Sequence, residues 1–136
     1  MKYMLIMNTP RDGYTQYMSW PKKVLEANIA FMQAFSKKLS AAGELVGAEG
    51  LASPLQAKLV RAGKDGKPIT DGVFPESKEF LAGYWIIDVD SPERAYQIAA
   101  EASTAPGATI TSVGGTPVDH LWIEVRQLMS SHKDLP

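Results

Sequence analysis

The stretch FLAGYWIIDVD, residues 80–90, decides the fold, because apolar residues stand at both its odd and its even positions. A strand with apolar side chains on both faces is typical of the centre of a sheet that is covered on both sides. The segment SPERAYQIAAEAS, residues 91–103, follows without a spacer. Ser91 is suited to cap a helix and Pro92 to occupy its first turn. We therefore predict a central strand followed directly by a helix.

The N-terminal part of the chain predicts a strand and a long helix. The β-forming segment KYMLIMN, residues 2–8, precedes RDGYTQYMSWP, residues 11–21, whose polar and turn-forming residues indicate a loop. The segment from Lys22 to Gly43 is expected to form a helix that Ser19 caps and that ends at its glycine. Its apolar residues recur at helical spacing: Leu25, Ile29, Met32 and Leu39.

The middle of the chain predicts shorter strands and a hairpin. ELVGAEGLA, residues 44–52, reads as a strand that its glycines weaken. QAKLVRAG, residues 56–63, alternates, and KPIT, residues 67–70, is expected to return beside it, because Asp65-Gly66 is a strong hairpin-turn signal. Two later segments are expected to be extended: TITSV, residues 109–113, and the alternating HLWIEVRQL, residues 120–128.

The order of these elements predicts an α+β fold. Strand, helix, two strands, a short strand, strand, helix and strand form the ferredoxin-like pattern, an antiparallel sheet with two helices on one face. We expect one domain over residues 1–130 and a polar tail over residues 131–136. The other face of the sheet would expose apolar side chains such as Met4 and Ile6, more than a monomer usually leaves uncovered. A homodimer packed sheet against sheet, as a dimeric α/β barrel, is therefore expected.

Composition narrows the classes of function. Charged residues make up 21% of the chain and the net charge is −1, which gives no reason to expect nucleic acid or a membrane surface as a partner. There is no cysteine, which excludes disulfides and thiolate chemistry. The chain has no metal-ligand spacing and no phosphate-binding glycine motif, so neither a metal nor a cofactor is expected. No apolar run approaches the roughly 20 residues of a membrane span, and a cytoplasmic location is expected.

The last predicted strand places ionisable side chains on one face. His120, Trp122, Glu124 and Arg126 alternate with residues that we expect to point to the helices, namely Leu121, Ile123 and Val125. Glu124 and Arg126 are either paired with each other and with neighbours, or form one wall of a polar pocket. His120 is either a capping or surface residue or a general base near neutral pH.

The segment TDGVFPESKE, residues 70–79, is the densest acidic cluster in the chain. Asp71-Gly72 alone is an ordinary turn dipeptide. Glu76, Lys78 and Glu79 follow at once, however, and Phe74 stands among them. Carboxylates and a lysine beside an aromatic ring are an arrangement that shifts carboxyl pKa values in pockets. The cluster therefore indicates either a locked turn or a site.

These residues also resemble a known family. MKYMLIM, AAGELVGAEGLASP, TDGVFPESKEFLAGYWIIDVDSPERA and IEVRQL together look like the YCII-related superfamily, and within it like the branch that carries an Asp-Gly-Pro-Phe motif followed by Ala-Glu-Thr-Lys-Glu. Six positions match that motif: Asp71, Gly72, Phe74, Glu76, Lys78 and Glu79. The sequence departs from it at three: Val73, Pro75 and Ser77.

The resemblance implies a dimeric ferredoxin-like α+β barrel. It also implies an Asp–His pair in a cleft near the dimer interface, although residues 1–50 contain no histidine to match the family's N-terminal one. Members of this branch are often encoded beside sigma factors of the extracytoplasmic-function class, which implies a link to transcription regulation.

Two functions follow from the motif. In the first, the protein binds a small polar molecule and uses Asp71 for acid/base chemistry, with His120 as a possible partner. The side chains expected to contact that molecule are Glu49, Phe74, Lys78, Glu79, Tyr84, Trp122 and Arg126. In the second, the protein is a non-catalytic regulatory dimer, in which Asp71 caps its turn, Lys78 pairs with an adjacent glutamate and Phe74 fills the core. The sequence does not decide whether the protein is an enzyme.

Overall fold

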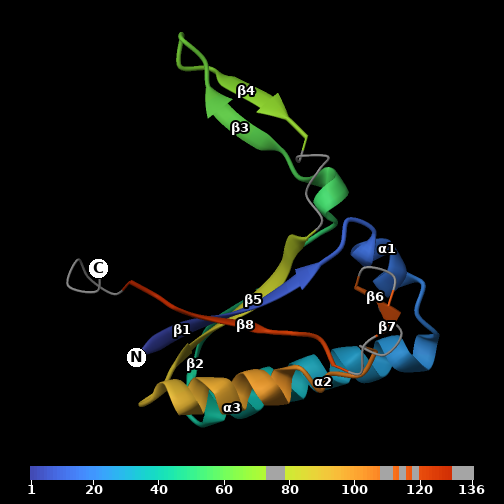
Figure 1. Cartoon of the computed structure of the whole chain (residues 1–136), viewed down its shortest axis with the longest axis vertical. Coiled ribbons are helices and arrows are strands. Elements are labelled where there is room, and N and C mark those ends of the chain that lie inside the picture. The colour runs from blue at the N-terminus through green and yellow to red at the C-terminus, as the bar shows by residue number, and fades with distance from the viewer. Residues whose placement is uncertain (73–78, 108–111, 114–115, 118–119, 130–136) are drawn as a thin grey trace.

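Four strands form the main antiparallel sheet, in the spatial order β2-β5-β1-β8 (Figure 1). The computed structural model describes residues 1–72, 79–107, 112–113, 116–117 and 120–129. The strands are β1 (Lys2–Thr9), β2 (Leu45–Gly50), β5 (Phe80–Asp88) and β8 (Glu124–Gln127). β5 lies between β1 and β2, with Trp85 opposite Leu5 on one side and Ala48 on the other. The predicted central strand is confirmed.

Two long helices cover one face of this sheet (Figure 1). They are α2 (Lys22–Ala41) and α3 (Pro92–Ala102). The ring of Phe35 on α2 meets that of Trp85 edge to face, with centroids 5.5 Å apart. Fully buried aliphatic side chains come from both layers: Leu5, Leu39, Ile87 and Ile98. Removing these side chains from water supplies the main driving force for folding.

The segment expected to be a loop contains a short helix, α1 (Gly13–Met18), so the prediction was wrong over these residues. The Gly13 amide donates to the carbonyl of Pro10 (2.9 Å), and the Gln16 side chain donates to Asp12 (2.9 Å). Ser19 ends α1 and does not cap α2, because its hydroxyl donates to the carbonyl of Gln16 (2.7 Å).

The buried stripe of α2 also differs from the expected one. Pro21 occupies the N-cap position, and the buried residues are Asn28, Phe35 and Leu39. Ile29 is exposed, since its neighbour Asn28 faces the interior instead. The predicted end of the helix is confirmed, because Gly43 follows the C-cap residue of α2 with a φ of +73°.

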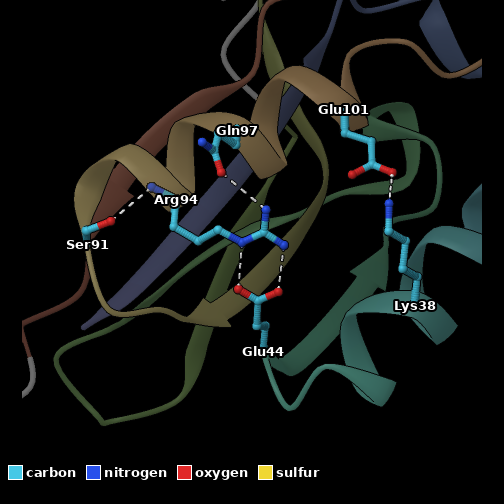
Figure 2. A network of polar contacts seen from close by, with 6 residues as sticks. All are labelled: Lys38, Glu44, Ser91, Arg94, Gln97 and Glu101. Atoms are coloured by element: carbon cyan, nitrogen blue, oxygen red, sulfur yellow. Dashed lines mark hydrogen bonds and ion pairs between the residues drawn. The ribbon is translucent and has the colours of Figure 1, made fainter.

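Charged side chains connect α3 to the end of α2 and the start of β2 (Figure 2). The Arg94 guanidinium donates to both carboxylate oxygens of Glu44 (2.8 Å each), and Lys38 pairs with Glu101 (2.7 Å). The hydroxyl of Ser91 accepts a hydrogen bond from the Arg94 amide (3.2 Å), which confirms the predicted cap.

A hairpin of β3 (Leu59–Ala62) and β4 (Pro68–Asp71) projects away from the main sheet (Figure 1). The Gly63 amide donates to the carbonyl of Lys67 (2.8 Å), and Gly66 has a φ of +79°, as the predicted turn requires. All eight residues of the two strands are exposed. A 3₁₀ turn, η1 (Pro54–Gln56), precedes the hairpin, and β6 (Ser112–Val113) pairs with β7 (Thr116–Pro117).

The face of the sheet opposite the helices is open in the described part of the chain. Met4, Ile6, Tyr84 and Ile86 lie on this side and are all partly exposed. β2 and β8 form the two edges of the sheet, so the described residues of one chain form no closed barrel. The fold is mixed α+β with an antiparallel sheet and, in the described ranges, three α-helices, none of them long and apolar enough to cross a membrane. The expected tail, residues 131–136, lies outside the described residues.

Candidate ligand cavity

A cavity of about 570 Å³ lies on the helix side of the sheet, beside α1. Its walls come from the end of β1, from α1, from Trp20 two residues after it, from one side of α2, and from the paired ends of β2 and β5. The turn after α3 closes it with Ala105 and Pro106. A concave space of this size, enclosed by several elements, is typical of small-molecule sites.

The chemistry of the walls is mainly apolar and aromatic. Five aromatic residues line the cavity, namely Tyr14, Tyr17, Trp20, Tyr84 and Trp85. The side chain of Tyr84, unlike that of Trp85, is on the open face of the sheet. Glu49 carries the single ionisable carboxylate among the described lining residues, and no lysine, arginine or histidine is among them. The remaining polar groups there are neutral hydroxyls and amides, so the cavity offers hydrogen bonds and very little charge.

Trp20, one of the lining residues, carries an unusual polar group. Its Nε1 atom is buried and has no hydrogen-bond partner among the described residues. Tyr17 packs against the ring, with centroids 5.0 Å apart and planes inclined by 60°. Gly107 lies against the same ring, so closely that a Cβ at that position would overlap Trp20. The ring is therefore held by packing, while its donor is unused.

Asn28 connects the same wall to the turn after α3. Its side chain is 6% exposed, and its Nδ2 donates to the carbonyl of Pro106 at 2.8 Å. Buried amides are stable when they are hydrogen-bonded in this way. The bond positions residues 105–107 against α2 and so helps to place Gly107 beside Trp20.

The hydroxyl of Tyr17 stays protonated over the physiological range. Burial raises the pKa of this phenol above its ordinary value of 10.0, and the neighbouring charge of Tyr14, when ionised, raises it further. The cavity therefore presents a neutral phenol beside a neutral indole.

The structure brings two of the sequence-predicted site residues to this cavity and leaves others elsewhere. Glu49 and Tyr84 line it and are paired across β2 and β5. Asp71 is exposed at the end of the projecting hairpin, where its Oδ1 accepts a hydrogen bond from the Gly72 amide (2.7 Å). Glu79 is exposed and does not line the cavity. Phe74 and Lys78, like Glu76, lie outside the described residues.

The alternation of exposure predicted for residues 120–126 is confirmed, although the strand itself is shorter than predicted and spans only Glu124–Gln127. Ile123 and Val125 pack against the core, whereas Trp122 is 94% exposed and Glu124 is exposed as well. The carboxylate of Glu124 lies 3.8 Å from the Arg126 guanidinium, which favours the paired interpretation of this row. His120, Trp122 and Arg126 are exposed and are not among the described residues that line the cavity. Their proposed contacts with a ligand therefore stay predictions.

Sequence reasoning did not identify Tyr17, Trp20 and Asn28 as site residues. The first two lie in the segment that was assigned to a loop. Asn28 lies on a helix whose apolar face was predicted from its aliphatic residues alone. One signal was present, namely three aromatic residues within seven positions of a short polar segment, Tyr14 to Trp20. As for metals, the described part of the chain contains no cluster of three or more histidine, cysteine, aspartate or glutamate residues that could hold an ion.

Comparison with known proteins assigns the chain to a family. The sequence model of the YCII-related domain matches residues 1–114, which include every β-strand of the main sheet except β8. A comparison with curated proteins finds no significant match. Because the family match covers most of the chain, the protein belongs to the YCII-related domain family.

Proposed function

We propose that this protein binds a small molecule in the cavity beside α1. The observation that carries the proposal is the cavity itself, a concave space of about 570 Å³ with a mainly apolar and aromatic lining. A mainly apolar cavity with a few convergent polar groups is the expected form of a small-molecule site.

A cavity-filling variant tests this proposal. Ser36 of α2 lines the cavity, and Ser40 lies one turn further along the same helix and is exposed. Ser36→Phe is expected to abolish the thermal stabilisation by compounds that a screen of small aromatic and aliphatic molecules identifies. Ser40→Phe is the matched control and should keep it. If the wild-type protein is stabilised by compounds and Ser36→Phe responds equally, the cavity is not the site.

The finer features of the fold belong to the same proposal. The strand order β2-β5-β1-β8, with antiparallel neighbours, supports a ferredoxin-like assignment, and the match of Asp71, Gly72 and Glu79 to the Asp-Gly-Pro-Phe motif supports that branch of the family.

We further propose a cytoplasmic homodimer that pairs through the open sheet face. The partly exposed side chains of Met4 and Ile86 support such an interface.

A catalytic role for Asp71, with His120, is a second candidate that rests on the motif. Asp71→Asn should then abolish turnover of whatever compound stabilises the protein, without loss of binding in the cavity. Equal responses of wild type and Asp71→Asn in both assays would favour the alternative, a non-catalytic dimer linked to sigma-factor regulation, in which Asp71 holds its turn through Gly72.

A further inference from the structure

The hairpin of β3 and β4 is left uncovered by its own fold. We propose that this hairpin is a docking arm that packs against a second copy of the chain, on the side of the main sheet that the helices leave open. This inference rests on the homodimer of the proposed function and assigns a further element to its interface.

The hairpin has little to stabilise it within one chain. β3 and β4 form a two-stranded sheet of their own, separate from the main sheet. All eight residues of the two strands are exposed, and the side chain of Val60 is 62% exposed. An isolated two-stranded hairpin is at best marginally stable in water, and a surface that packs against one face stabilises it. The hairpin therefore gains stability from a partner.

The register of the hairpin separates its side chains into two different faces. Val60 lies opposite Thr70, and Ala62 lies opposite Pro68. Opposite residues share a face and successive residues alternate, so these four form one face, which we call the uncharged face. The other face includes charged side chains, such as that of Asp71. Only the uncharged face can be covered without desolvating a charge.

The position of the hairpin indicates what covers it. The helices α2 and α3 lie on one side of the main sheet, and the hairpin rises on the other side (Figure 1). Met4 and Ile86 are partly exposed on that same side. A body packed on the open sheet face would therefore lie beside the hairpin. If that body is a second copy related by a two-fold axis, its own hairpin reaches back in the same way.

The distribution of charge favours a second copy as the partner. Residues 58–71 carry four basic and two acidic side chains, whereas the whole chain has 14 basic and 15 acidic ones, so the rest of the chain is net acidic. On the open face, one row across the four strands reads Glu49, Tyr84, Ile6 and Glu124, with a carboxylate at each edge of the sheet. A net basic arm and a net acidic body attract each other between copies.

Site-specific cross-linking tests the contact directly. The chain has no cysteine, so a single introduced cysteine can carry a benzophenone photo-cross-linker at one known position. Val60→Cys places it on the uncharged face, and Ile69→Cys, on the opposite face of the same hairpin, is the matched control. Isotope-labelled and unlabelled protein would be mixed, irradiated and analysed by mass spectrometry. Cross-links that join labelled to unlabelled peptides are expected from position 60 and not from position 69.

The affinity of the dimer gives a second measurement. A lysine at position 60 would carry a charge into the covered face, so Val60→Lys should raise the dissociation constant of the dimer about tenfold, equivalent to about 1.4 kcal/mol. Ile69→Lys places the same charge on the other face and should leave the constant unchanged. Both positions are exposed in one chain, so neither substitution disturbs the folded monomer. Sedimentation velocity over a dilution series measures the constants.

The possible outcomes separate the arm from the dimer on which it rests. If the wild type is monomeric at every concentration, the proposed dimer fails and the arm with it. If Ile86→Lys separates a wild-type dimer, but Val60→Lys does not weaken it and position 60 gives no cross-links between copies, the arm alone is overturned. Cross-links from position 60 that stay within one chain would also overturn it. Equal effects at positions 60 and 69 would overturn the assignment of the uncharged face.

Discussion

The Cα atom of Gly107 lies against the indole of Trp20, so that a Cβ there would overlap Cζ3 and Cη2 of the ring. Gly107 also has a φ of +104°, which side chains other than glycine rarely adopt. Gly107→Ala therefore combines backbone strain with a displaced ring. We expect a loss of about 2 kcal/mol in the free energy of unfolding, measured by urea denaturation.

Gly66→Ala is the control for that experiment. Gly66 has a φ of +79° in the hairpin turn, but no atom lies within 4 Å of the position of a Cβ. Gly66→Ala introduces backbone strain without steric overlap and should therefore lower the free energy of unfolding by about 1 kcal/mol. Equal losses in the two variants would mean that the contact between Gly107 and Trp20 contributes nothing beyond backbone conformation.

The pair Glu44–Arg94 makes stability depend on pH. Hydrogen bonds from Arg94 lower the pKa of the Glu44 carboxyl below its ordinary 4.5. Because the folded-state pKa is the lower one, the pair stabilises the protein above the unfolded value, and this contribution disappears as pH falls through the folded value. Glu44→Gln should lose about 1 kcal/mol at pH 7, and its difference from wild type should vanish in acid.

Thermal unfolding between pH 7 and pH 3 measures this difference. Glu26→Gln is the matched control, because Glu26 lies on an exposed part of α2 and its contact with Lys22 is long, 3.8 Å. It should follow the wild-type profile. A Glu44→Gln variant that stays parallel to wild type across the whole range would exclude the pair as the source of pH dependence.

The sequence predicted the framework because its signals are local. The apolar run around Trp85, the cap at Ser91 and the turn at Gly66 each specify an element from its own residues, and each is confirmed. The α1 segment was assigned to a loop because its polar and turn-forming residues are equally frequent in loops. Its stabilising contacts, such as that between Gln16 and Asp12, are made by residues of this kind.

The cavity could not be predicted for a different reason. Its wall depends on segments far apart in the chain, such as Trp20 and Gly107, or Asn28 and Pro106. An asparagine in a helix is normally read as exposed, and only the carbonyl that it meets across the fold makes its burial favourable. The acidic motif of residues 70–79 contributes Asp71 to an exposed hairpin instead, and residues 73–78 lie outside the described residues.

The amide of Asn28 is expected to hold the turn after α3. Asn28→Ala removes the donor to Pro106 and leaves a partly buried carbonyl without this partner, at a cost of about 2 kcal/mol in unfolding free energy. Asn28→Asp should cost more at pH 7, because a buried carboxylate then faces that carbonyl, and it should recover in acid when the carboxyl can donate. Chemical denaturation at two pH values measures both effects. A smaller loss for Asn28→Asp than for Asn28→Ala at pH 7 would show that this site is open to water.

The open sheet face supplies the last prediction, which concerns the proposed dimer. Ile86 lies on this face of β5, beside Met4 of β1, and is partly exposed. A lysine at this position would carry its charge into an apolar interface, so Ile86→Lys should convert a dimer to a monomer, with half the mass in light scattering. Ile29→Lys places the same charge on the exposed side of α2 and should leave the mass unchanged. A monomeric wild type at micromolar concentration, or a dimeric Ile86→Lys, would exclude this interface, and the partly exposed apolar residues of the sheet would then need another explanation.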